Sequence, residues 1–144
     1  MNATDTLENK LVDHLFRSAT FAKPAALWVA LFTAPTSDAG GAAEVAGGGY
    51  ARVNLPPLDT NWTATQGGTG GVSSGTGGQT TNAVAITFPA PSADWGLVTH
   101  MAFFDAPTGG TPLPAWAPLT TPRDIKAGDP APRFPAGAIA VTVA

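Results

Sequence analysis

Residues 71–75, GVSSG, match the G-x-S-x-G pattern that presents a nucleophilic serine in many hydrolases. Such a serine, here Ser73, needs a strand leading into the motif, a helix leading out, and a histidine with an acid to activate it. The motif instead lies within residues 63–81, where more than a third of the residues are glycine. Chance composition explains the match, so we expect no catalysis and predict a protein that is not an enzyme.

The two histidines, His14 and His100, are too few for a metal site. Zinc takes three or four protein ligands, the chain has no cysteine, and its carboxylates are scattered. We therefore expect neither a metal nor a cofactor. The alternation of residues 97–104 puts His100 on one strand face with Val98, Ala102 and Phe104, which favours a core or interface role for it.

Asp94 and Asp105 flank the same apolar run and invite comparison with the acid pair of a glycosidase. A strand rises ~3.3 Å per residue, so the run between them separates the two carboxylates far beyond the spacing that such enzymes use. Both are better interpreted as turn residues at the ends of a strand.

The four tryptophans divide by their surroundings. Trp28 and Trp95 lie in or beside apolar runs, which favours core packing. Trp62 and Trp116 lie near loops and prolines, which makes them candidates for a contact surface such as a sugar site.

Composition restricts the class of partner. The seven Lys and Arg residues form no dense run and the net charge is −3, so a nucleic-acid interface is not expected. Charged residues make up only 12% of the chain, about half the usual share, which indicates surfaces that are covered by copies of the chain or by other proteins. The first ten residues are polar and acidic, unlike a signal peptide, so we expect synthesis and assembly in a cytoplasm.

The chain is organised around residues 26–34, ALWVALFTA, its most apolar run. The run has the length of a strand and is too short to span a membrane, so no membrane partner is expected. Both of its alternating faces are apolar, which predicts a central strand that is covered on both sides. Residues 97–104, LVTHMAFF, are nearly as apolar and are its expected neighbour.

Residues 5–18 are predicted to form a helix, with Asp5 as N-cap and Glu8 three residues later. Its apolar stripe contains Leu7, Leu11, Leu15 and Phe16, together with Val12. Two interpretations stay open: the stripe packs on its own domain, or it docks against a neighbouring subunit. The candidate interface residues are Leu7, Leu11, Leu15, Phe16, Trp62 and Trp116.

The length of the chain fits one domain, residues 1–144. Glycine and proline are frequent, and further strands are expected at 50–55, 82–88, 138–143 and, as a short edge strand, 116–119. We therefore predict a mainly β fold, a β-sandwich or barrel-like domain over 24–144 with six to seven short strands after the N-terminal helix. The Gly-rich segment 63–81 should be a surface loop that contacts something outside the domain.

Sequence blocks in order along nearly the whole chain resemble a family of small bacteriophage virion proteins, usually labelled phage tail fibre or minor tail proteins. The most specific blocks are E-V-x-G-G-x-Y-A-R at 44–52 and A-D-W-G-x-V-T-H at 93–100. The link at 56–81 is longer here than in similar proteins. The resemblance implies a non-enzymatic virion component that is assembled in the host cytoplasm.

The resemblance implies partners among tail or capsid subunits and a homo-oligomer, for which a trimer is common in fibre and decoration proteins. We expect a tail-associated fibre or adaptor protein. The alternatives are a capsid decoration (cement) protein that stabilises the head shell and a carbohydrate-binding module for host attachment that uses Trp62 or Trp116.

Overall fold

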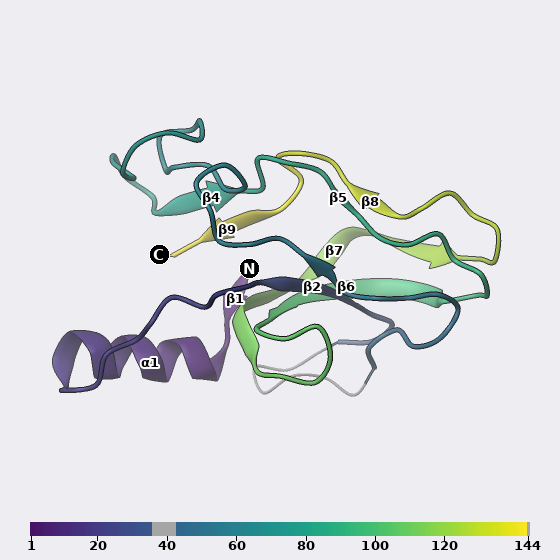
Figure 1. The fold of residues 1–144 in the computed structure, drawn as a ribbon, viewed down its shortest axis with the longest axis horizontal. Coiled ribbons are helices and arrows are strands. Elements are labelled where there is room, and N and C mark those ends of the chain that lie inside the picture. The colour runs from purple at the N-terminus through teal and green to yellow at the C-terminus, as the bar shows by residue number, and fades with distance from the viewer. Residues whose placement is uncertain (36–42, 144) are drawn as a thin grey trace.

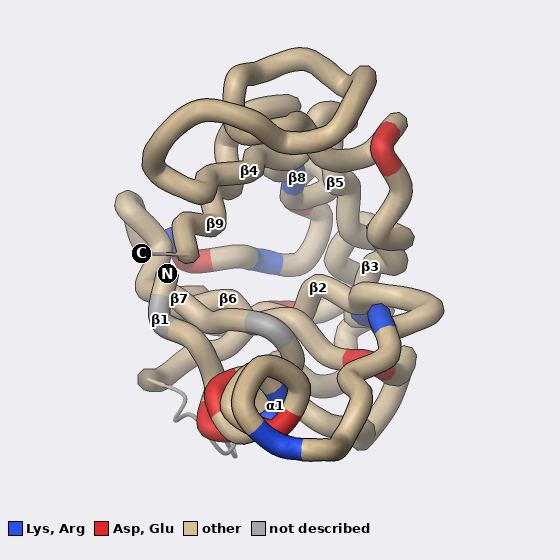
Figure 2. Tube along the Cα trace, turned by 90° about the vertical axis from the view of Figure 1, so that its left-hand side faces the viewer, with Lys and Arg blue, Asp and Glu red and all other residues tan. Residues whose placement is uncertain are grey.

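The computed structural model describes residues 1–35 and 43–143. Its elements are β1 (Asn2–Ala3), α1 (Asp5–Phe16), β2 (Trp28–Phe32), β3 (Val53–Asn54), β4 (Gln79–Thr81), β5 (Ile86–Thr87), β6 (Gly96–Phe104), β7 (Pro112–Ile125), β8 (Arg133–Phe134) and β9 (Ala140–Thr142). They form a five-stranded antiparallel sheet in the order β1-β7-β6-β2-β3 and two ribbons, β4-β9 and β5-β8. The ribbons lie over one face of the sheet, and α1 lies on the other side (Figures 1 and 2).

The predicted central strand is β2, which pairs with β6 on one side and with β3 on the other. Its register with β6 joins the two apolar runs directly, from Trp28 opposite Phe104 to Phe32 opposite His100. Four of its five residues are buried, so the expectation of a strand covered on both faces is confirmed. The most apolar stretch of the chain thus determines the middle of the sheet.

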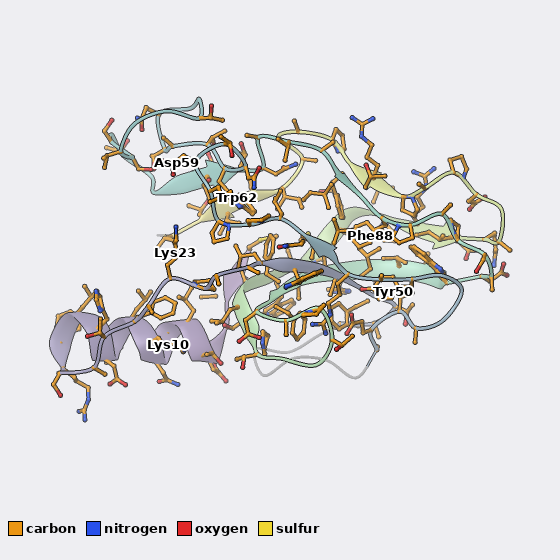
Figure 3. The ribbon with its side chains drawn as sticks, viewed as in Figure 1. Lys10, Lys23, Tyr50, Asp59, Trp62 and Phe88 are labelled. Carbon is orange, nitrogen blue, oxygen red and sulfur yellow. The ribbon has the colours of Figure 1, made fainter. Side chains whose placement is uncertain are left out.

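Each face of the sheet carries its own apolar cluster. On the ribbon side, β2 and β6 contribute residues such as Leu31 and Phe103, and the ribbon strand β5 contributes Ile86. On the opposite side, Phe32 and Phe104 stack with ring centroids 6.2 Å apart in a smaller cluster. The larger cluster is the main core, because the ribbons close over it (Figure 3).

The predicted fold class, a mainly β domain with one N-terminal helix, is confirmed. Within the described residues the sheets do not close into a barrel, and there are nine strands where six or seven were expected. Most of the additional strands are two or three residues long, which is too short to show an alternating pattern in sequence. The expected strands at 50–55 and 82–88 shrink to β3 and β5, because proline and glycine neighbours limit the pairing.

We expected Val98 on the same face of β6 as His100, Ala102 and Phe104, and this was wrong for Val98. The pairing of β6 with β7 shifts register between Val98 and His100, which is a bulge-like irregularity. Val98 therefore packs in the large cluster, whereas Ala102 and Phe104 pack in the small one. His100 is half-buried beside Trp116, with ring centroids 6.3 Å apart, and its Nδ1 lies 2.8 Å from the Thr99 hydroxyl oxygen.

The largest error concerns Trp116, which was expected in a short edge strand at 116–119. It lies instead in β7, which has 14 residues and pairs with β6 along much of its length, with β1 on its other side. β1 pairs only with Ala115 and Trp116, so most of the outer edge of β7 makes no ladder in the described structure. Prolines are tolerated in a strand where no ladder bond is lost, which explains how four of them fit into β7.

The N-terminal helix is present, but its N-cap is Thr4 and not Asp5. The Thr4 hydroxyl accepts a hydrogen bond from the Leu7 N–H and donates one to the Pro112 carbonyl, which ties the start of α1 to β7. The helix ends at Phe16, two residues before the predicted end. No helix in the described ranges is both long and apolar enough to cross a bilayer.

Candidate functional site

Helix α1 presents an apolar surface that its own domain does not cover. None of its residues is buried. Leu15 and Phe16 are 66% and 81% exposed, and Val12 is 51% exposed, while Leu7 and Leu11 are half-buried. The stripe thus packs on the domain at its start and is open to solvent at its end. Figure 1 shows the helix projecting from the sheet.

The start of α1 is fixed firmly to the body. β1 adds to the sheet beside β7, Met1 packs against the large cluster, and Thr4 is fully buried. Toward the far end, the return segment contacts the helix: the Phe21 N–H donates to His14 Nδ1 and the Phe21 ring lies 5.2 Å from Lys10 Nζ. The helix is therefore a projecting arm with a rigid base.

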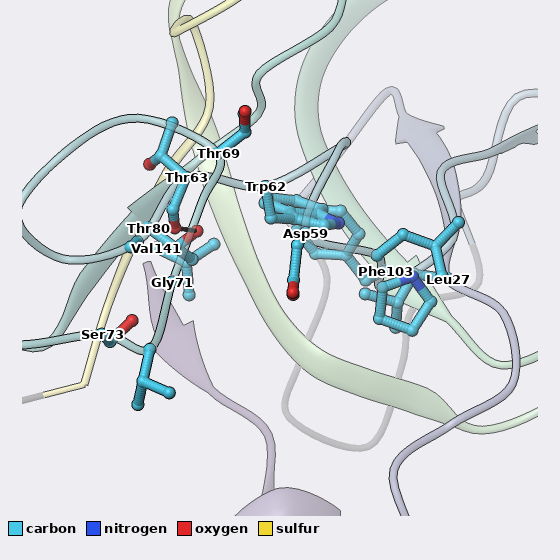
Figure 4. A pocket seen from close by; sticks show the side chains of 14 residues that line it. Leu27, Asp59, Trp62, Thr63, Thr69, Gly71, Ser73, Thr80, Phe103 and Val141 are labelled. Carbon is cyan, nitrogen blue, oxygen red and sulfur yellow. Dashed lines mark hydrogen bonds between the residues drawn. The ribbon is translucent and has the colours of Figure 1, made fainter.

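A second surface feature is a cleft of about 600 Å³ beneath the glycine-rich loop (Figure 4). Its lining includes apolar side chains from the sheet and from the turn before Trp62, and polar side chains mainly from the loop and β4. These residues are Leu27, Pro57, Leu58, Asp59, Trp62, Thr63, Ala64, Thr69, Gly71, Val72, Ser73, Thr80, Phe103 and Val141. We refer to this feature as the Trp62 cleft.

The position of Trp62 in the cleft is set by a tight turn. The N–H groups of Asn61 and Trp62 both donate to the Leu58 carbonyl, and the Asn61 side chain donates to the Pro56 carbonyl. The indole then packs edge-on against Phe103 of β6, with ring centroids 5.7 Å apart. The turn after the Pro-Pro pair therefore fixes both Trp62 and the exposed Asp59 at the cleft.

The residues considered for catalysis are not brought together. Ser73 lies in the exposed loop, where its hydroxyl accepts a hydrogen bond from the Thr65 N–H. His14 lies on α1 and His100 on β6, on different elements from Ser73. Within residues 1–35 and 43–143, no three His, Asp or Glu side chains are grouped as metal ligands would be.

Asp94 and Asp105 lie beyond opposite ends of β6, as turn residues should. Asp94 accepts from the Ala127 N–H and lies 3.5 Å from Lys126 Nζ. The Ala127 hydrogen bond, and then the Lys126 charge, lower the pKa of Asp94 below its ordinary value. Asp105 accepts from the Thr111 N–H and closes the β6–β7 turn, which confirms the turn interpretation of both.

The candidate interface residues occupy three separate places. Leu7, Leu11, Leu15 and Phe16 follow α1. Trp62 packs on the ribbon side of the sheet, and Trp116 packs on the opposite side, against the small cluster. The structure therefore offers an α1 surface and a Trp62 cleft, not one continuous site.

Sequence reasoning did not single out Asp59, Thr69 or Phe103 as residues around Trp62. Phe103 was assigned to a core strand, and its contact with Trp62 depends on a turn that brings distant segments together. The turn itself had a signal, since Asp59 follows a Pro-Pro pair and precedes Asn61, which are turn-forming residues.

Comparison with known families matches residues 2–142 to the family described as Podophage GP4 fiber I protein gp80. The match covers nearly the whole chain. The chain belongs to this family. The resemblance to phage tail-fibre-type proteins is thereby confirmed, and the protein has a structural, tail-associated role in a phage particle. A search of curated proteins found no match.

In this fibre-family protein, the two most specific sequence blocks pack against each other. The Trp95 indole N–H and the Ser92 N–H both donate to the Gly48 carbonyl. Tyr50, which follows the glycines, packs edge-on against Trp95 with ring centroids 5.3 Å apart. Burial of the phenol raises the pKa of Tyr50 well above its ordinary value. The blocks are therefore structural, and they hold the β2–β3 connection against the start of β6.

We predict that Gly48→Ala lowers the free energy of unfolding by about 2–3 kcal/mol, because alanine is strained in the left-handed backbone conformation and its Cβ would clash with neighbouring atoms. Gly48 has φ of +55°, and a Cβ there would lie 2.9 Å from the Ala93 carbonyl oxygen and 3.0 Å from the Trp95 ring. Gly47 is the matched control, because its φ is +72° but a Cβ would meet nothing within 4 Å.

Gly47→Ala should therefore lower the same free energy by only about 1 kcal/mol, the backbone term alone. Urea unfolding of both variants measures the difference. Equal losses in the two variants would show that the packing of Trp95 on Gly48 does not constrain this turn.

Proposed function

We propose that this fibre-family protein is a tail-associated fibre or adaptor subunit that attaches to a neighbouring virion protein through the exposed end of α1. The observation that carries the proposal is the exposure of Leu15 and Phe16 on a helix with a firmly anchored start. Large apolar side chains at the tip of a projecting arm are typical of a protein–protein contact. The partner surface should be an apolar groove that accepts one helical turn.

The charges on α1 suit such a contact. Arg17 pairs with Asp13 at 2.9 Å, one turn apart, next to Phe16. The basic residues are spread along the chain and gather in no patch on the body (Figure 2). An interface of this kind depends on apolar burial, so its affinity should depend little on salt.

The test is a Leu15→Ser/Phe16→Ser double variant supplied to a phage that lacks the native gene. Loss of two apolar contacts should lower incorporation into purified particles by about tenfold or more, as quantified by mass spectrometry. The isolated variant should unfold at the same urea concentration as the native protein, because neither side chain is buried. Removing the whole helix with β1 would be a poorer test, since Met1 and Thr4 contribute to the fold.

Leu97→Ser is the matched control, because Leu97 is 51% exposed on β6, away from α1. It should incorporate normally. Normal incorporation of the double variant, or an equal loss in Leu97→Ser, would contradict attachment through α1.

We further propose that the subunit is a homo-oligomer, with a trimer as the first form to test, and that it is assembled in the host cytoplasm. Sedimentation of the purified protein compares its mass with the 14.5 kDa chain. The decoration alternative differs in copy number, because a cement protein would approach the number of main shell subunits in purified heads. Such a copy number would contradict the tail assignment.

A further inference from the structure

We propose that the Trp62 cleft is a binding site for a neutral saccharide, contacted by Trp62 and Asp59. The inference goes beyond the attachment proposed for α1 and does not depend on it, because the helix tip and the cleft share no residues. The volume of about 600 Å³ lies within the range of roughly 300–1,000 Å³ that is usual for small-molecule sites. A short oligosaccharide has room in it.

Trp62 supplies the aromatic surface and an unused donor. The indole is half-buried and lines the cleft, with its edge held against Phe103. Among the described residues, its Nε1 is a buried side-chain nitrogen without a hydrogen-bond partner. A buried donor without a partner is costly, so a ligand that turns the indole edge toward the cleft and brings an acceptor would relieve this cost. A sugar hydroxyl is such an acceptor.

Asp59 supplies the complementary acceptors. It is exposed at the cleft, and its carboxylate makes no hydrogen bond or ion pair with the described part of the chain. An ionised carboxylate accepts through two oxygens, which suits a pair of neighbouring hydroxyls. Figure 4 shows the labelled side chains of Thr69 and Ser73 around the same cleft, and the Ser73 hydroxyl, which accepts from the Thr65 N–H, keeps its proton to donate.

The charge and aromatic content of the lining select a neutral ligand. No Lys or Arg lines the cleft, and Asp59 would repel an anion. A phosphate or an acidic sugar is therefore disfavoured. A quaternary ammonium usually binds against several aromatic faces. Phe103 is fully buried, so Trp62 is the aromatic ring of the lining that is open to a ligand, and this ligand class is disfavoured too.

The wall of the cleft is held in shape although it is rich in glycine. Gln66 donates through its side chain to the Val72 carbonyl at 3.1 Å and accepts from the Ser74 N–H at 2.8 Å. The Thr65 N–H also donates to the Ser73 hydroxyl. These bonds link the start of the loop to residues 72–74, so that a ligand meets a preformed wall and less ordering opposes binding.

The experiment uses the full chain and an array of neutral and acidic oligosaccharides, followed by titration of each one that binds. We expect binding to neutral members, with a shift of the Trp62 indole N–H resonance, which Trp62→Phe identifies in the spectrum. Trp62→Phe and Asp59→Ala should each weaken binding by about tenfold or more. Asp124→Ala is the matched control, because Asp124 is an exposed acid on β7 outside the cleft, and it should bind normally.

Trp62→Phe keeps an aromatic ring against Phe103 and Asp59→Ala removes no bond, so both variants should fold. No binding to any neutral saccharide, preference for acidic ones, or binding unchanged in both variants would overturn the proposal. Particle incorporation reports separately on α1, so either proposal can fail without the other. The purified protein should not self-associate through the cleft. Self-association that Trp62→Phe abolishes would also overturn the proposal.

Discussion

Arg52→Ala should lower the free energy of unfolding by about 3–5 kcal/mol, as is usual when one partner of a buried ion pair is removed. The Arg52 side chain is 4% exposed and forms a bidentate pair with Glu44, with both N–O distances 2.7 Å. Its Nη1 also donates to the carbonyls of Ala106 and Gly109, and its guanidinium lies 3.8 Å from the centre of the Phe104 ring. One side chain thus joins the β2–β3 connection to the β6–β7 turn.

The loss is large because several groups lose their partner together. Without Arg52, the Tyr50 hydroxyl is the one side-chain donor left to the Glu44 carboxylate among the described residues, and this hydroxyl itself accepts from the Leu31 N–H. Glu44 is only 26% exposed, so water replaces the guanidinium poorly. The effect should appear as a lower urea midpoint with an unchanged slope.

Arg17→Ala is the matched control. Arg17 also pairs with an acid, Asp13, but its side chain is 71% exposed, so the loss should be within about 1 kcal/mol. Arg52→Lys should recover only part of the stability, because an ammonium cannot reproduce the planar fork. If Arg52→Ala and Arg17→Ala lost similar amounts, the Arg52 network would not be a structural centre of the fold.

The apolar pattern of the sequence was sufficient to predict the centre of the sheet. Residues 26–34 are apolar on both alternating faces, and the structure buries both faces of β2 against separate clusters. Its pairing with β6 could be predicted because residues 97–104 are the nearest match in hydrophobicity. The Gly109–Gly110 turn that follows was also visible as a local signal, and both residues have positive φ.

Features that depend on pairing geometry were not predictable in the same way. The register shift beside His100 moves Val98 to the other face, and nothing in the alternation of LVTHMAFF marks it. The length of β7 was hidden by its prolines, whose cost depends on whether a neighbouring strand needs the missing N–H. The neighbour on the outer edge of β7 is the two-residue strand β1, which is far away in the sequence and pairs with only a small part of β7.

The candidate sites show the same division. The apolar stripe of α1 was visible from its spacing, but the exposure of Leu15 and Phe16 follows from the direction in which the helix leaves the sheet. Trp62 was marked by its isolation among polar residues. Its cleft could not be predicted, because it requires the turn at 56–62, β6 and the glycine-rich loop to meet.

Asn82→Ala should lower the free energy of unfolding by about 2–3 kcal/mol, because it removes three hydrogen bonds and leaves the buried Ile139 N–H without its partner. Asn82 is fully buried between the ribbons. Its side-chain oxygen accepts from the Ile139 N–H, and its side-chain nitrogen donates to the carbonyls of Val84 and Pro135, all at 2.8 Å. The Pro135 carbonyl keeps a second donor, the Ala138 N–H, so the loss falls on Ile139 and Val84.

Asn61→Ala is the matched control for this loss. Asn61 is half-buried, and its side chain makes one hydrogen bond, to the Pro56 carbonyl. Its replacement should cost about 1 kcal/mol. Urea unfolding of the two variants, followed by far-ultraviolet circular dichroism, gives both free energies.

Asn82→Asp separates the acceptor from the donors at the same site. The new carboxylate still accepts from the Ile139 N–H but faces the carbonyls of Val84 and Pro135, to which the amide donated. Burial and these carbonyls should raise the folded-state pKa of the aspartate above its unfolded value of ~3.9. For an acid with a raised folded pKa, the unfolded state loses its proton first as pH rises. The stability of Asn82→Asp relative to the native protein should therefore be lower at neutral pH than near about pH 4. A pH-independent difference between Asn82→Asp and the native protein, or a loss in Asn82→Ala no larger than in Asn61→Ala, would show that the Asn82 side chain does not hold the two ribbons together.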